Sequence, residues 1–201
     1  MPLDQRLVDA AVTAAGLSAR YSQTHRHYHT LIHVEHVLER VVELSTEPDD
    51  ATALCAAAWF HDAIYAPGRS DNEERSAFLA RETLELVGAS PGLSTEVARL
   101  VTLTASHHPE PDDQAGAVMC DADLSILGST PDEYAAYAAA IREEYSLVPD
   151  DAFRAGRARI LRQLLGRPSL FHTSIGRERW EGYALANVRQ EVFRLEGSGR
   201  E

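Results

Sequence analysis

The spacing of apolar residues is the feature that most restricts what this chain can fold into. Apolar residues recur every three to four positions in nearly every segment, whereas no convincing stretch alternates apolar and polar residues as a half-buried strand does. The pattern predicts nine helices, over residues 3–15, 30–44, 51–64, 71–87, 94–106, 115–127, 131–145, 151–165 and 177–195. We therefore expect an all-α protein, built as a bundle of about eight or nine helices.

The length and the punctuation of the sequence favour one domain. A chain of 201 residues has room for one domain, and short Pro, Gly and Asp clusters separate the expected helices. We expect this domain to cover residues 1–201, with a core at roughly 20–195 and a frayed tail at 197–201. Residues 51–64 are almost wholly apolar, which predicts a central buried helix capped by Asp49 or Asp50.

Several classes of protein are disfavoured by what the chain lacks. No run of 18 apolar residues occurs, so no membrane-spanning helix is expected. The first ten residues include an acid, Asp4, and no apolar stretch, so no secretory signal is expected. The two cysteines, Cys55 and Cys120, make neither a disulfide framework nor a four-cysteine zinc site. These observations predict a cytoplasmic protein.

The charged residues narrow the function further. All 19 basic residues are arginine, and the formal net charge is −12. The lack of lysine excludes a P-loop lysine and Schiff-base chemistry, and the acidity argues against binding to duplex nucleic acid. Residues 153–179 differ, with seven arginines against one acid, Glu178. Such a stretch either faces a small anionic ligand or forms the solvated face of an amphipathic helix.

Histidines gather in one short part of the sequence. Five of the nine lie between residues 25 and 36, and the four-residue spacing of His29 and His33 places both rings on one helix face, which His36 extends. Asp62 follows His61 at the end of the most apolar predicted helix, where the helix dipole is negative and the surroundings are apolar. A bound cation would supply the positive charge that such a carboxylate needs.

A third polar feature consists of Asp121 and Asp123 in the apolar segment 115–127. Taken alone, each feature is explained as well by a satisfied core histidine or by an acid pair on the surface. Taken together, three otherwise apolar segments place imidazole or carboxylate groups where burial is predicted, which favours a bound divalent metal ion. Manganese, zinc, iron, cobalt, nickel and magnesium are all compatible with such ligands.

The order of these residues resembles the signature of the HD superfamily of metal-dependent phosphohydrolases. The matching positions are Tyr28-His29, His33, His61-Asp62 and Ala122-Asp123-Leu124. A small bacterial branch of predicted HD phosphohydrolases is similar at further positions: Arg26-x-Tyr-His-x-x-x-His, His61-Asp-Ala-Ile-Tyr65, Asn72-Glu73, Thr104-x-x-His107, Asp121-Ala-Asp-Leu124, Ile141-Arg-Glu-Glu-Tyr145 and Gly156-Arg157. The resemblance covers roughly residues 20–195 and implies a helical domain of the HD type.

The resemblance also implies a set of metal ligands: His33, His61, Asp62 and Asp123. Asp123 is preferred to Asp121 because it occupies the Ala-Asp-Leu position.

Two further roles concern protons. The Ala-Asp-Leu-Ser run looks like that of cyclic-nucleotide phosphodiesterases, in which the Tyr-His before the ligand histidine supplies a proton donor. The resemblance makes His29 that donor, although Thr30 stands where the family often has asparagine and leaves the orientation of His29 less fixed. Asp62 or Glu73 is the expected acceptor of the proton of water, while Glu73 also fits a plain first-turn helix acid.

The candidates for binding phosphate oxygens are Arg26, His107, Arg142, Tyr145 and Arg157. Arg142, Tyr145 and Arg157 fit equally well a role in tying the last helices together.

One divalent metal ion is expected rather than two. Binuclear members of the superfamily place two separated histidines before the final aspartate, whereas His107 and His108 are adjacent, and neighbouring helical residues diverge by about 100°. The resemblance then implies that metal-activated water hydrolyses a phosphate ester of a nucleotide or another small phosphorylated metabolite. The alternatives are a non-catalytic metal-containing HD protein that binds a ligand or regulates, and, with less support, a di-iron HD oxygenase.

Overall fold

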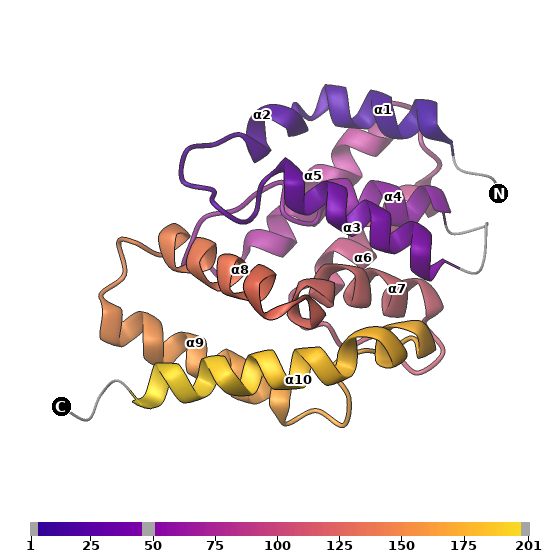
Figure 1. Ribbon diagram of the computed structural model, residues 1–201. Helices are drawn as coiled ribbons and strands as arrows, with labels where there is room; N and C mark the ends of the chain where they lie inside the picture. The colour runs from indigo at the N-terminus through magenta and orange to yellow at the C-terminus, as the bar shows by residue number, and fades with distance from the viewer. Residues whose placement is uncertain (1–3, 46–50, 198–201) are drawn as a thin grey trace. The chain divides into compact units, whose positions relative to one another are not determined.

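The computed structural model describes residues 4–45 and 51–197, and within them every regular element is a helix (Figure 1). The prediction of an all-α fold is confirmed. The elements are α1 (Gln5–Ala14), α2 (Leu17–Tyr21), α3 (Leu31–Leu44), α4 (Ala51–Phe60), α5 (Asn72–Leu86), α6 (Pro91–Leu103), α7 (Gln114–Leu124), the 3₁₀ helix η2 (Ser125–Gly128), α8 (Pro131–Glu144), α9 (Asp150–Leu165) and α10 (Ser174–Gly197).

Local chemistry explains where these helices depart from the predicted ranges. Helix α2 was not predicted; it begins after Gly16, whose left-handed backbone (φ 60°) ends α1 and redirects the chain. Helix α6 begins at Pro91 rather than at residue 94, because the side chain of Ser90 accepts a hydrogen bond from Leu93 N and caps it. The predicted caps Asp49 and Asp50 lie outside the described residues, as do positions 198–201 of the predicted tail.

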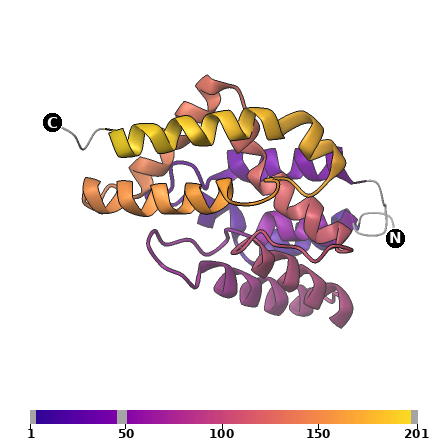
Figure 2. The same ribbon diagram turned by 90° about the horizontal axis from the view of Figure 1, so that it is seen from below.

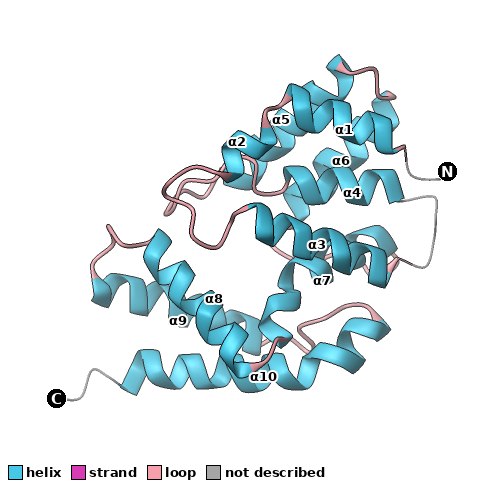
Figure 3. Cartoon of the chain, turned by 45° about the horizontal axis from the view of Figure 1, so that its top comes forward, coloured by secondary structure: helices cyan, strands magenta, loops and turns pink. Residues whose placement is uncertain are grey.

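The chain divides into two compact units, Met1–Asp123 and Leu124–Glu201. At the centre of the first unit lies α4, which contacts α1, α3, α5 and α6; Figure 3 shows it between α1 and α3. Eight of the ten α4 residues are buried, so this helix is surrounded on all sides, as its apolar sequence predicts. The end of α4 therefore has a position fixed by four neighbouring helices.

The second unit has its own apolar core, formed by Leu127, Tyr134, Leu161, Leu164, Leu170, Phe171, Ala184 and Val188. Helices α9 and α10 lie side by side (Figures 1 and 2), and α10 also passes closely over η2. A Cβ atom on Gly128 would lie 2.9 Å from the Cα of Trp180, so only glycine allows this approach. Asn187 Nδ2 strengthens the contact by donating to the carbonyls of Leu127 and Ser129.

Among residues 4–45 and 51–197, we find no helix with the length and apolar character needed to cross a bilayer.

Candidate metal centre

Three side chains, one on α3 and two directly after α4, meet in the interior of the first unit. His33 lies in the first turn of α3, and His61 and Asp62 follow directly after α4. The Nε2 atoms of His33 and His61 are 3.0 Å apart, and Asp62 Oδ2 lies 3.0 Å from His61 Nε2 and 3.6 Å from His33 Nε2. One donor atom from each of the three lies within 4.8 Å of the other two, so a single ion could contact all three.

Asp123, near the end of α7, brings a fourth donor to the same group. Its Oδ1 lies 3.2 Å from His33 Nε2 and 3.7 Å from His61 Nε2. The side chains are strongly shielded from solvent, with exposed fractions of 4% for His33, 1% for His61, 13% for Asp62 and 15% for Asp123. The structure thus brings together the four residues that the sequence nominates as ligands.

The spacing and chemistry of these four donors fit a divalent metal ion. Ligands about 2.0–2.2 Å from one ion, at tetrahedral or octahedral angles, lie about 2.8–3.6 Å from one another. The distances of 3.0–3.7 Å between the histidine nitrogens and their neighbours are close to that range. Two imidazoles and two carboxylates suit zinc, manganese, iron, cobalt and nickel.

The hydrogen bonds at the end of α4 determine which nitrogen of His61 is available. His61 Nδ1 lies 2.8 Å from the carbonyl oxygen of Ala58 and must donate to it, because a carbonyl only accepts. The Nε2 atom of the neutral ring then carries the lone pair, and it faces Asp62 and Asp123. A backbone carbonyl that fixes the tautomer in this way is usual for metal-binding histidines.

The electrostatics of the group call for a positive charge. Burial alone would raise the pKa values of Asp62 and Asp123, but the nearby imidazoles outweigh it and hold both well below the usual range. Burial alone would lower the pKa of His61, but the Asp62 and Asp123 carboxylates raise it to about 9; burial prevails at His33 and lowers its pKa. Two ionised carboxylates in so dry a site are matched by either an imidazolium or a metal cation.

His107 approaches the group from a different direction. It follows α6 in a turn where its own backbone is left-handed (φ 50°), and its Nε2 donates to Asp123 Oδ2 at 2.8 Å. Asp123 thus directs Oδ2 to His107 and Oδ1 to His33. The exposed His108 points elsewhere and contacts the carbonyl of Ser106, so the two histidines diverge, in a turn rather than on a helix. The predicted contact of His107 with phosphate stays a prediction.

His29 lies at the edge of the group. Its Nε2 is 3.9 Å from Asp62 Oδ2, and its side chain is 18% exposed, more than that of any of the four nominated ligands. The ring packs against Tyr65, with 4.1 Å between ring centroids, and contacts Tyr28 edge-on at 5.0 Å. These aromatic contacts orient the His29 ring, whose orientation was less certain from the sequence because Thr30 replaces the asparagine that is frequent in the family. The sequence had not assigned Tyr65 this role, since an aromatic residue in a mixed loop carries no periodic signal.

The other predicted site residues of the first unit are placed as follows. Arg26 is almost fully buried, with 5% of its surface exposed, and its guanidinium donates to backbone carbonyls. Glu73 is half-buried in the first turn of α5 and makes no hydrogen bond or ion pair with the described residues. Asp121 is fully buried on α7, two positions before Asp123 and therefore about 200° around that helix. Their predicted roles stay predictions.

Three predicted substrate-binding residues belong to the second unit, where each has internal contacts. Arg157 forms a two-pronged ion pair with Glu191 of α10, with 2.9 Å between Nε and Oε1, and also donates to the Tyr137 hydroxyl. Arg142 donates to the Tyr145 carbonyl at 2.6 Å, and its guanidinium pairs with Asp150 at the start of α9. These contacts agree with the tying role, and substrate binding by these residues stays a prediction.

The arginine-rich stretch 153–179 contributes further contacts between the last helices. Arg154 donates to the backbone carbonyl of Leu195, and Arg162 pairs with Glu196 at 2.6 Å, both on α10. Together with the Arg157 pair, these bonds use three of the seven arginines to join α9 to α10.

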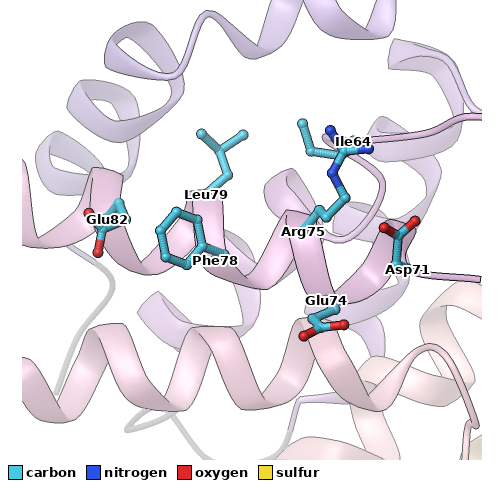
Figure 4. Close-up of a pocket in the computed structure, with 7 residues that line it drawn as sticks. All are labelled: Ile64, Asp71, Glu74, Arg75, Phe78, Leu79 and Glu82. Carbon is cyan, nitrogen blue, oxygen red and sulfur yellow. The ribbon is translucent and has the colours of Figure 1, made fainter.

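A separate surface pocket of about 480 Å³ lies along α5 (Figure 4). Its lining combines an apolar part with charged residues: Ile64, Asp71, Glu74, Arg75, Phe78, Leu79 and Glu82. None of the four nominated metal ligands lines it.

Comparison of the chain with models of protein families, with curated proteins and with solved structures found no match.

Proposed function

We propose that the protein is a metal-dependent phosphohydrolase of the HD type. In this proposal it cleaves a phosphate ester of a nucleotide or another small phosphorylated metabolite in the cytoplasm. The single observation that carries the proposal is the convergence of His33, His61, Asp62 and Asp123 at donor–donor distances that suit one ion. The same four residues, in this order, support the resemblance to the HD superfamily.

A divalent ion at this centre would supply a water of lowered pKa and a Lewis acid for the phosphate oxygens. The residues of the chain contribute the rest. His61 presents the Nε2 lone pair because Ala58 accepts from Nδ1, and Asp123 keeps one oxygen turned to the group because His107 binds the other.

Proton transfer in the proposed reaction falls to His29 and a carboxylate. His29 lies beside the group rather than inside it, so its ring can protonate the leaving oxygen of a substrate that enters from the solvent side. The lowered pKa of Asp62 keeps its carboxylate ionised, and its Oδ2 lies 3.0 Å from His61 Nε2, so Asp62 would be the first candidate to accept the proton of water. Glu73 is the alternative acceptor, because its carboxylate is not engaged with any described residue.

The decisive variant is Asp62→Asn. The amide keeps the shape of the side chain but loses the negative charge. Loss of a residue that only supports a metal ligand costs about 10- to 100-fold, so for a ligand itself we expect metal affinity and phosphatase activity to fall by more than about 100-fold. His36→Gln is the matched control, because His36 is an exposed histidine on α3 and should leave both unchanged. Metal content by elemental analysis and helical content by circular dichroism complete the comparison.

Full metal occupancy in Asp62→Asn would contradict the assignment of Asp62. A panel of nucleotides and generic phosphate esters, assayed with manganese, cobalt, nickel and magnesium, then separates the candidate functions. Turnover of a phosphate ester supports the hydrolase. Metal binding without any turnover favours the non-catalytic alternative, and two irons per chain with oxygen-dependent turnover favour the oxygenase.

A further inference from the structure

The segment 62–66, which follows α4 and includes Asp62, is held largely by hydrogen bonds from side chains, beside two backbone bonds at Ala63 N and Ala66 O. Its residues are not helical, so their backbone groups need other partners. Ser76 Oγ accepts from Ile64 N and donates to Ile64 O, while the Asn72 amide bonds both the N–H and the carbonyl of Ala66. Both of these side chains come from α5 and act on the far half of the segment.

Arg26 holds the near half, at Asp62 itself. Its Nη1 donates to the Asp62 carbonyl at 2.8 Å and to the His29 carbonyl at 3.0 Å, and its Nη2 donates to the Ala63 carbonyl at 3.3 Å. Its Nε donates to Gln23 Oε1 at 3.3 Å. One guanidinium therefore joins the backbone of Asp62 to the backbone of His29.

Two aromatic rings fix the guanidinium in this place. Its carbon lies 5.0 Å from the ring centroid of Tyr21 and 5.4 Å from that of Tyr65. The Tyr21 hydroxyl in turn donates a hydrogen bond to the carbonyl of Trp59, in the last turn of α4. The Tyr65 ring packs against the His29 ring. Arg26 is thus braced against both of the elements that it connects.

We propose that Arg26 is a positioning residue that sets the placement of Asp62 and His29 relative to each other. The inference rests on the proposed metal centre and adds a role for a residue that the sequence suggested as a phosphate ligand. A buried guanidinium whose N–H groups point at three carbonyls has little capacity left for a phosphate oxygen. Lysine cannot reproduce the contacts, because an ammonium lacks the planar fork.

The test compares two substitutions that act on opposite ends of the same segment. Arg26→Lys removes the fork at Asp62, whereas Asn72→Ala removes the two bonds at Ala66, four residues further on. Co(II) is the probe, because its visible absorption reports both the affinity and the geometry of its ligands. Thermal unfolding of the metal-free variants measures the general cost to the fold.

Positioning predicts that Arg26→Lys weakens Co(II) binding about 10- to 100-fold and alters its spectrum, the range for residues that support metal ligands. Asn72→Ala should lower thermal stability while keeping the wild-type Co(II) spectrum and an affinity within about 3-fold of the wild type, a margin well below that range. Wild-type affinity and spectrum in Arg26→Lys would overturn the proposal. An equal loss in Asn72→Ala would also overturn it, because the effect would then belong to the rigidity of the whole segment.

A measurement on the unaltered protein covers the case in which Arg26→Lys does not fold. The Nε–H signal of Arg26 in a ¹⁵N spectrum should be protected from exchange and should shift when Zn(II) saturates the centre. A rapidly exchanging signal, or one that ignores Zn(II), would overturn the proposal.

Failure of the metal centre would look different. If the wild-type protein binds neither Co(II) nor Zn(II), the proposed function fails. The imidazole signals of His29 and His61 in the metal-free protein then decide on Arg26, which is supported if Arg26→Lys shifts them and Asn72→Ala does not. Unshifted signals in both variants would overturn it.

Discussion

At the scale of single residues, two of the nominated ligands, His61 and Asp123, each use one polar atom to face the centre and the other to bind a supporting group. His61 donates through one ring nitrogen to a backbone carbonyl and presents the other to the carboxylates. Asp123 divides its two oxygens in the same way, between His107 and the histidine pair. In these two residues the donor atom that faces the centre is therefore oriented by a bond on the far side of the side chain, and removing that bond should loosen the centre without removing a ligand.

His107 allows this idea to be tested without a backbone artefact. Asparagine tolerates the left-handed conformation of residue 107 but is too short to keep the bond to Asp123. We expect His107→Asn to weaken metal binding by about 10- to 100-fold, measured by competition with a chelating dye. His108→Asn is the control, because that neighbour is exposed and should bind metal as the wild type does.

Two results would argue against this account of His107. Unchanged metal affinity in His107→Asn would show that Asp123 does not need the bond. A raised KM for a phosphate ester, with metal affinity preserved, would instead support the substrate-binding role expected from the sequence.

At the scale of helices, much of the structure could be predicted because burial leaves a periodic trace. The apolar sequence of α4 predicted a central helix, and the pattern located the other long helices. The pattern could not predict α2, because five residues are too few to establish a period, nor the exit of His61 and Asp62 from α4. The convergence of the nominated ligands could be predicted, because they are polar residues in otherwise apolar segments. The hydrogen bonds from Arg26 to backbone carbonyls could not, because any residue type can supply a carbonyl.

The helices of the second unit make a prediction about stability. The Arg157 and Glu191 side chains are 11% and 10% exposed, so loss of either partner leaves a nearly buried charge. We expect Arg157→Met to lower the free energy of unfolding by about 3 kcal/mol in urea titrations. Arg159→Met, an exposed substitution two positions along α9, should stay within about 0.5 kcal/mol of the wild type.

The same variant separates the two readings of Arg157. If Arg157→Met unfolds at the same urea concentration as the wild type and has a raised KM for a phosphate ester, Arg157 contacts the substrate rather than joining α9 to α10.

At the scale of the whole molecule, the four nominated ligands all belong to the first compact unit. A ligand that binds only the folded state stabilises it by about 2.7 kcal/mol when present at one hundred times its dissociation constant. We expect removal of metal with a chelator to increase hydrogen exchange first at the start of α3, the end of α4 and the end of α7. Exchange that is unchanged at all three places would contradict a shared ion.

The burial of α4 has a consequence for how this protein tolerates inherited variation. Ala57 and Ala58 have no exposed surface, so a larger side chain at either position must push the helix away from its neighbours. The displacement would carry His61 and Asp62 with it, since they follow within five residues. In a genetic screen, replacements of these alanines by larger residues would therefore have the same phenotype as substitutions of the nominated ligands, although neither alanine side chain contacts the centre.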